Sequence, residues 1–215
     1  MKKMFKNFEI KSFLIPIYLV IIQAFFFFLV KIFQSDPNYI GSMLDDKIPF
    51  SVWFIIPYCI WFILLFLVPM YYYYHDKNLL VNYSASYVIC ALLADVVFLI
   101  YPTIVNRPDV ACEGAVSCLA HLIFFFDTPA INCLPSMHCA IAMLFILTSC
   151  SSKKVSNQFR IPIIILSILI MYATLGIKQH VVIDLITGDI LMTIVYLIVR
   201  NNKKIVNLTK KLLKI

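Results

Sequence analysis

The sequence predicts an all-α, polytopic membrane protein: one membrane-embedded domain, residues 1–215, built as a bundle of six transmembrane helices. Of its 215 residues, 62% are hydrophobic and only 13% are charged, whereas a soluble domain has about 25% charged residues. Six apolar stretches approach the roughly 20 residues that a spanning helix needs. They are continuously apolar and do not alternate as barrel strands do. These observations exclude a soluble protein, and the length leaves no room for a large soluble domain.

The six predicted spans follow the apolar runs in chain order. They cover about residues 12–33, 49–72, 83–101, 134–150, 161–177 and 181–199. The first run follows Lys2, Lys3 and Lys6, as in a signal peptide, but it is too long and lacks a small-x-small cleavage site, so we expect a retained anchor. The tyrosine run 71–74 at the end of the second span is typical of an interfacial aromatic belt.

The distribution of cations predicts the orientation in the membrane. If the N-terminus is cytoplasmic, fourteen of the eighteen Lys and Arg residues fall in inner segments. The outer segments keep only Lys31, Lys47, Arg107 and Lys178. By the positive-inside rule, both termini are cytoplasmic in the plasma membrane. This topology explains the net charge of +7 without a nucleic-acid partner. The basic tail 200–214 either rests on anionic lipid or is an ordinary stop-transfer flank.

The seven cysteines show no CxxC spacing and therefore no metal signature. Cys112, Cys118 and Cys133 fall in the outer loop between the third and fourth spans. A disulfide is expected there if the compartment is oxidising, and the sequence leaves the pairing open. We predict neither a metal nor a cofactor.

Ionisable residues beside apolar helices are costly and often mark function, and three clusters of them occur at outer helix ends. In the first, Arg107 stands between breaks at Pro102 and Pro108, after the third span. Two interpretations are open at this position. Arg107 is either an interfacial anchor or a bidentate clamp for phosphate, whose oxygens match the guanidinium fork.

The second cluster is Pro135-Ser136-Met137-His138, at the start of the fourth span. A proline at the first helical position, followed by serine and histidine in the first turn, places free backbone N–H groups and a hydroxyl at the positive end of the helix dipole. This predicts an anion site. His138 adds a group that exchanges protons near neutral pH.

The third cluster, residues 178–184, opens the sixth span with Lys178, His180 and Asp184. Histidine and aspartate four residues apart share one helix face, so Asp184 is expected to accept a hydrogen bond from one nitrogen of His180. The other nitrogen is then free as a nucleophile or base. A purely structural hydrogen bond is the alternative. The predicted topology places Arg107, His138 and His180 on the same, non-cytoplasmic side.

Together the clusters resemble the type 2 phosphatidic acid phosphatase superfamily of membrane lipid phosphatases and phosphotransferases, whose pattern is KxxxxxxRP, PSxH and SRxxxxxHxxxD. Arg107-Pro108 matches the end of the first motif, residues 135–138 match the second, and His180 with Asp184 matches the end of the third. The resemblance covers about residues 101–188. The local forms are similar to the branch that contains inositol phosphorylceramide synthases.

The sequence departs from the family pattern at two cations. The lysine of the first motif falls at Ile100, and the Ser-Arg pair of the third falls at Ala173-Thr174. Lys178, two residues before His180, is a candidate to replace one of these cations.

The resemblance implies a metal-independent mechanism with defined roles. His180, oriented by Asp184, attacks the phosphorus of a lipid phosphate and forms a phosphohistidine, while His138 protonates the leaving oxygen. Arg107, Ser136 and Lys178 bind the phosphoryl oxygens. The implied activity is a lipid phosphatase acting on a phosphomonoester or pyrophosphate. The alternatives are a phosphotransferase that moves a phospho-headgroup between lipids and an inactive lipid-phosphate binding or transport protein. The lipid and the oligomeric state are left open.

Overall fold

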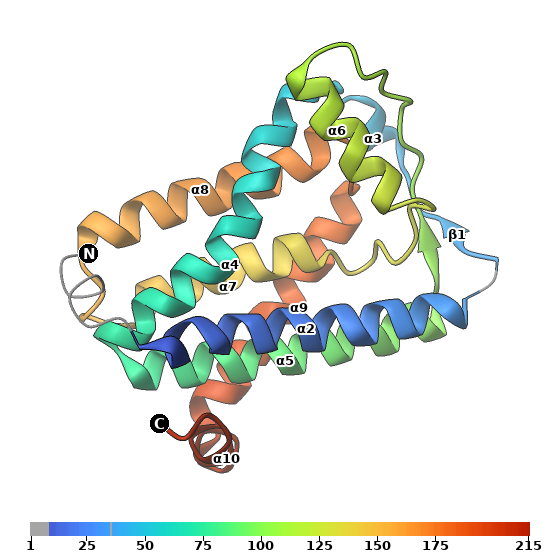
Figure 1. The fold of residues 1–215 in the computed structure, drawn as a ribbon. Coiled ribbons are helices and arrows are strands. Elements are labelled where there is room, and N and C mark those ends of the chain that lie inside the picture. The colour runs from blue at the N-terminus through green and yellow to red at the C-terminus, as the bar shows by residue number, and fades with distance from the viewer. Residues whose placement is uncertain (1–8, 35) are drawn as a thin grey trace.

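The computed structural model describes residues 9–34 and 36–215, which are mainly helical (Figure 1). The elements are α2 (Ile10–Ile32), β1 (Asn38–Tyr39), α3 (Met43–Asp46), η1 (Val52–Phe54), α4 (Ile55–His75), α5 (Lys77–Ile100), β2 (Thr103–Ile104), α6 (Ala115–Phe126), α7 (Met137–Ser151), α8 (Asn157–Gly176), α9 (Val182–Asn201) and α10 (Lys203–Leu213). The all-α, polytopic prediction is confirmed.

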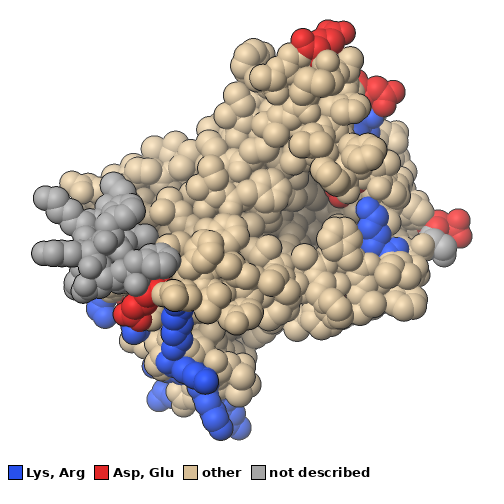
Figure 2. Space-filling model, viewed as in Figure 1, with Lys and Arg blue, Asp and Glu red and all other residues tan. Residues whose placement is uncertain are grey.

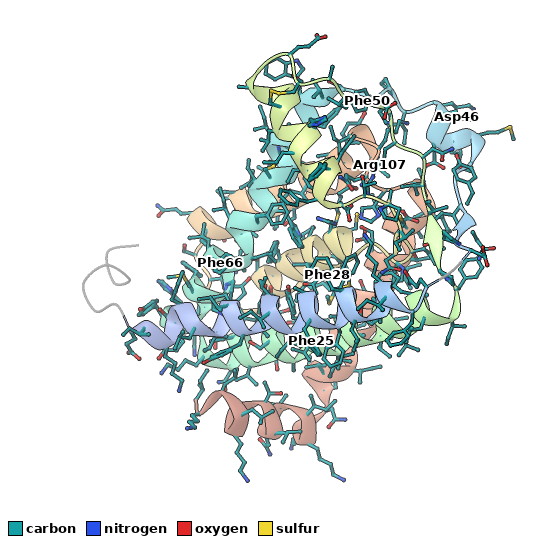
Figure 3. All side chains as sticks on the ribbon, turned by 45° about the vertical axis from the view of Figure 1, so that its right-hand side comes forward. Phe25, Phe28, Asp46, Phe50, Phe66 and Arg107 are labelled. Atoms are coloured by element: carbon teal, nitrogen blue, oxygen red, sulfur yellow. A yellow bond between two sulfur atoms is a disulfide. The ribbon has the colours of Figure 1, made fainter. Side chains whose placement is uncertain are left out.

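Within residues 9–34 and 36–215, five segments are long and apolar enough to cross a membrane: α2, η1 with α4, α5, α8 and α9. Large apolar side chains cover their outer surfaces; Phe25 of α2, for example, is 61% exposed (Figure 3). Such a surface suits lipid and not water. The count of six spans and the cytoplasmic position of both termini stay predictions.

The predicted fourth span is the short central helix α7. Its 15 residues extend about 22 Å, less than the roughly 30 Å of a bilayer core. It packs against α4, α5, α8 and α9, and Ala140, Ile141 and Leu144 are fully buried. Because its neighbours shield it from lipid, α7 does not need the length of a lipid-facing helix.

The tyrosine run at the end of α4 corrects one prediction. Tyr71, Tyr72 and Tyr73 are at most 4% exposed, so they lie inside the bundle and not on the lipid-facing surface of an aromatic belt. The hydroxyl of Tyr72 forms hydrogen bonds with the hydroxyls of Thr148 and Ser149, at 2.9 and 3.0 Å. Tyr72 thereby joins α4 to the end of α7.

We call the end of the bundle where α7 and α9 begin the outer end, after its predicted orientation, and the opposite end the inner end. The outer end is a set of short, mutually paired segments. β1 and β2 pair in parallel, with Asn38 opposite Thr103. The short apolar helix α6 was not predicted, because its 12 residues are too few for a span. A disulfide joins Cys112 to Cys118 at its start, while Cys133 is a buried free thiol. Helix α6 packs against η1 and α4 at this end (Figure 1).

The inner end carries α10, an amphipathic helix that lies across α5 and α9 (Figure 1). Ile205 and Leu213 pack against the main core, while lysines cover the other side, so that basic residues gather at this end in Figure 2. The tail is therefore a docked helix. Its contact with anionic lipid stays a prediction.

Candidate active site

His180 and Asp184 meet as predicted, at the junction of the 177–181 loop and α9. Nδ1 of His180 lies 3.0 Å from Oδ2 of Asp184. The helix begins only at Val182, so His180 precedes it. Asp184 occupies the third helical position, where its carboxylate also accepts the N–H of Val181 at 3.1 Å. The pair thus forms at a capped helix start, and not along one helix face.

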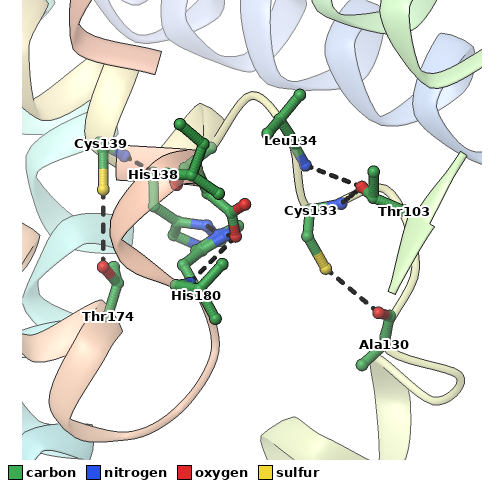
Figure 4. A network of polar contacts seen from close by, with 12 residues as sticks. Thr103, Ala130, Cys133, Leu134, His138, Cys139, Thr174 and His180 are labelled. Carbon is green, nitrogen blue, oxygen red and sulfur yellow. Dashed lines mark hydrogen bonds and ion pairs between the residues drawn. The ribbon is translucent and has the colours of Figure 1, made fainter. Parts of the chain in front are cut away.

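The second histidine lies against the first (Figure 4). Nε2 of His180 is 3.3 Å from Nδ1 of His138. If Nδ1 of His180 donates to Asp184, its Nε2 holds a lone pair, and the hydrogen of this contact comes from His138. The rings of Tyr58 and Trp61 lie over His138, with centroids 4.7 and 4.3 Å away. The result is a chain of polar contacts from Asp184 through His180 to His138.

The segment before α7 positions His138. Ser136 is the N-cap, and its hydroxyl accepts the N–H of Cys139 at 3.3 Å. Pro135 therefore precedes the cap, which corrects the prediction that it is the first helical residue. The N–H of Ser136 also donates to the carbonyl of Asp184 at 3.0 Å. Gly188 permits this approach, because a Cβ there would lie 2.4 Å from the Ser136 carbonyl oxygen.

The structure gives Ser136 a capping role, and its binding of substrate stays a prediction.

The strand residue Thr103 holds the turn that precedes Ser136 in place. Its hydroxyl oxygen accepts the N–H groups of Cys133 and Leu134, at 3.2 and 3.0 Å (Figure 4). The loop after α5 and the start of α7 are thereby joined.

Arg107 reaches the same site and is not free. Its Nη2 lies 2.7 Å from Oδ2 of Asp127, and Nη1 donates to the Asp127 carbonyl at 3.2 Å. The guanidinium also lies over the ring of Phe124, 5.5 Å from the centroid. Its side chain is only 10% exposed, and it lies beneath α6 (Figure 3). Sequence reasoning missed Asp127, because the carboxylate at the end of α6 belongs to no motif.

A cavity of about 360 Å³ connects these groups. His138, His180, Arg107 and Asp127 are among its lining residues. Apolar side chains, mainly from α2 and α4, supply most of the rest of the wall, and Figure 2 shows the hollow on this face of the molecule. The aromatic part of the wall, including Trp61, could not be identified from sequence because it lies in an ordinary apolar span.

Lys178 is held away from this cavity and is not among its lining residues. Its Nζ donates to the carbonyls of Asp45 and Ile48, at 2.6 Å each. The Asp45 carboxylate in turn accepts the N–H of Val182 at 2.7 Å. We call this set, with Ser42, the outer strap, because it ties α3 to the two ends of the loop that carries His180. The role of Lys178 as a replacement cation stays a prediction.

The contacts of the outer strap lower the pKa of the Asp45 carboxyl. Burial alone would raise this pKa, but hydrogen bonds from Ser42 and the Val182 backbone, with the charge of Lys178, lower it below its ordinary value. Asp45 is therefore an ionised anchor at neutral pH.

The two positions where the family has cations supply none here. The side chain of Ile100 is 78% exposed on the outer surface of α5. Thr174 is fully buried under the His180 loop, where its hydroxyl donates to the Met171 carbonyl at 2.7 Å. Among residues 9–34 and 36–215, no group of three or more His, Cys, Asp or Glu side chains could hold a metal ion. Metal independence stays a prediction.

Comparison with known proteins identifies the family. The model of the PAP2 superfamily matches residues 36–198, about three quarters of the chain, and the match includes every site residue described above. Neither curated proteins nor solved structures give a match. The family consists of phosphatases and phosphotransferases, so the chain is an enzyme of that broad type on a multi-pass membrane scaffold. On this match and on the three ordered motifs, the chain belongs to the PAP2 superfamily.

Proposed function

We propose that the protein is an integral membrane lipid phosphatase that hydrolyses a phosphomonoester or pyrophosphate of a lipid through a phosphohistidine on His180. The observation that carries the proposal is the polar chain from Asp184 through His180 to His138, which ends in a cavity with mainly apolar walls. The polar chain suits phosphoryl transfer, and the apolar wall suits the lipid tail.

The proposed reaction has two steps. Nε2 of His180 attacks phosphorus, the bond from phosphorus to the leaving oxygen breaks, and His138 gives that oxygen its proton. His138 then takes a proton from water, the water oxygen attacks phosphorus, and the bond to His180 breaks. Because His138 lies 3.3 Å from the attacking nitrogen, its ring has to move aside when the phosphoryl group enters. Asp184 keeps the proton on Nδ1 throughout.

Arg107 is the proposed clamp for the phosphoryl oxygens, because its guanidinium lines the cavity together with both histidines. Its ion pair with Asp127 holds the guanidinium at one place before substrate binds. The proposed site faces the non-cytoplasmic side of the plasma membrane, and the positive-inside distribution of cations supports that side.

Phosphate release by the purified protein in detergent tests this proposal. A panel of phosphatidate, isoprenyl pyrophosphate and glycolipid phosphate is supplied with EDTA present. We expect wild type to release inorganic phosphate, His180→Ala to release none, and His75→Ala to match wild type, since His75 lies at the other end of α4. No release from any lipid by wild type would refute the phosphatase. Headgroup transfer to an added alcohol would identify a phosphotransferase instead.

A further inference from the structure

Two buried amide side chains in the wall of the active-site cavity have not yet been given a role. Asn132 is 5% exposed and Gln179 is 1% exposed, and both line the cavity with His138 and His180. Within the described part of the chain, neither Nδ2 of Asn132 nor Nε2 of Gln179 has a hydrogen-bond partner. Buried amides without partners destabilise a fold, and each one in a native protein needs an explanation.

The backbone holds both amides firmly beside the histidines. Gln179 directly precedes His180. The backbone N–H groups of Gln179 and His180 donate to the carbonyl of Thr174, at 3.0 and 3.1 Å. Asn132 has a positive φ of 64°, which asparagine tolerates better than most residues. Its N–H donates to the carbonyl of Thr103 at 3.0 Å. Neither amide is therefore a mobile surface group.

Other donors in the same wall also lack partners among the described residues. They are Nε of Arg107 and Nε1 of Trp61. Serine hydroxyls without partners occur elsewhere, as at Ser84 and Ser167, but a helical serine satisfies itself by rotating toward a carbonyl one turn earlier. Amide, guanidinium and indole N–H groups lack that freedom. The four residues that carry these donors come from separate segments and all line one cavity. An anion with several oxygens requires several such donors around it.

We propose that the amides of Asn132 and Gln179 donate hydrogen bonds to the phosphoryl oxygens of the substrate and take the place of the two cations that this chain lacks at Ile100 and Thr174. Rotation about the last side-chain torsion turns each N–H into the cavity when the phosphoryl group enters. This inference rests on the proposed function, in which that group belongs to a lipid.

Neutral donors suit this site for an electrostatic reason. The only cation that lines the cavity within the described chain is Arg107, and Asp127 already pairs with it. Lys178 is committed to two carbonyls of the outer strap. Amides stabilise developing negative charge on oxygen without requiring a further buried cation and its counter-ion.

Orthovanadate, a phosphate-like anion, tests the proposal directly by binding. The chain has two tryptophans; replacing the exposed Trp53 in all proteins by Trp53→Phe leaves Trp61 in the cavity wall as a fluorescent reporter. The test variants are Asn132→Gly, which keeps the positive φ, and Gln179→Met, which keeps the length. We expect each to weaken vanadate binding about tenfold and the double variant about 100-fold.

Matched controls are Asn201→Ala and Gln158→Met, two exposed amides outside the cavity, and these should bind vanadate as wild type does. Thermal unfolding distinguishes a direct loss of vanadate binding from a loss of fold stability. The test variants should unfold at the wild-type temperature or above it, because each loses a buried group without a partner. Weaker binding with a lower unfolding temperature would mean that the amides are structural, and unchanged binding in both variants would overturn the proposal.

The same proteins distinguish this inference from the proposed function. If wild type binds vanadate through the two amides but releases phosphate from no lipid, the anion site stands and the phosphatase fails. If wild type releases phosphate while Asn132→Gly and Gln179→Met keep the wild-type kcat and KM, the phosphatase stands and the amide proposal fails. Absence of vanadate binding by wild type overturns the amide site.

Discussion

Each end of the bundle holds one partly buried arginine, and the two arginines are used differently. At the inner end, Arg160 donates from all three guanidinium nitrogens: to the carbonyls of Ser149, Ser152 and Val155 and to the side chain of Asn157, at 2.8 to 3.0 Å. At the outer end, Arg107 has one carboxylate partner, and its Nε has none among the described residues.

This difference distinguishes a polar side chain that stabilises the fold from one that is available to bind a ligand. Arg160 donates to the carbonyls where α7 ends and the chain turns into α8, and four of its five N–H groups are used in holding the fold. Arg107 lines a cavity and keeps donor capacity for a ligand. A buried polar group with every bond made stabilises the fold, whereas one with unused bonds costs stability and points to binding. Substitutions at the two ends should therefore change different properties.

The largest effect is expected at the outer end with Asp184→Asn. The amide cannot hold the proton on Nδ1 of His180 as the carboxylate does, so Nε2 loses its nucleophilic form. We expect kcat for lipid phosphate hydrolysis to fall by about 10³-fold or more. Asp46→Asn, at an exposed carboxylate of α3 (Figure 3), is the control and should retain full activity. A fall of less than tenfold for Asp184→Asn would contradict its orienting role.

The same substitution at both arginines tests the comparison itself. Lysine cannot reproduce the fork geometry of arginine. Arg107→Lys should lower kcat/KM about 10- to 100-fold and leave the unfolding temperature near that of wild type. Arg160→Lys should cost about 2–4 kcal/mol of stability and leave kcat/KM of the folded enzyme unchanged. If the two variants lost stability equally, the proposed division between the two ends would be wrong.

Lys178→Met tests whether Lys178 is a structural part of the outer strap or a cation of the phosphate site. Its two carbonyl contacts place it in the outer strap, so we expect about 1–3 kcal/mol lower stability and vanadate affinity within about threefold of wild type. Lys47→Met, at an exposed lysine directly after α3, controls for loss of charge. Vanadate affinity at least about tenfold weaker, with unchanged unfolding temperature, would show that Lys178 replaces a missing cation.

The smallest expected effect is a pH dependence of the outer strap. The pKa of Asp45 in the folded protein is lowered from its ordinary value of 3.8. Its carboxylate therefore stabilises the fold above that ordinary value, and this contribution disappears as pH falls through the lowered pKa. When the pH is lowered from 7 to 3, the unfolding temperature of wild type should decrease more than that of Asp45→Asn. Equal losses would show that Asp45 does not anchor the His180 loop.

Local spacing made much of the site predictable. Five of the six predicted spans coincide with long apolar helices. A helix in lipid needs a continuous apolar run, and such a run can be recognised directly in the sequence. The contact of His180 with Asp184 followed from a separation of four residues, even though the helix starts later than expected. The aromatic belt failed as a prediction, because Tyr72 looks the same in sequence whether it faces lipid or the Thr148 hydroxyl.

The sequence by itself determined the membrane class, the helical architecture, the order of the motifs and the pairing of His180 with Asp184, since each depends on composition or on residues within one turn. Only the tertiary structure decided that His138 meets His180, that Arg107 pairs with Asp127, that Lys178 turns to the outer strap, and that Asn132 and Gln179 share a cavity. These contacts join segments 20 to 133 residues apart. Their geometry is set by how the helices pack and the outer loops close, which no local pattern in the chain encodes.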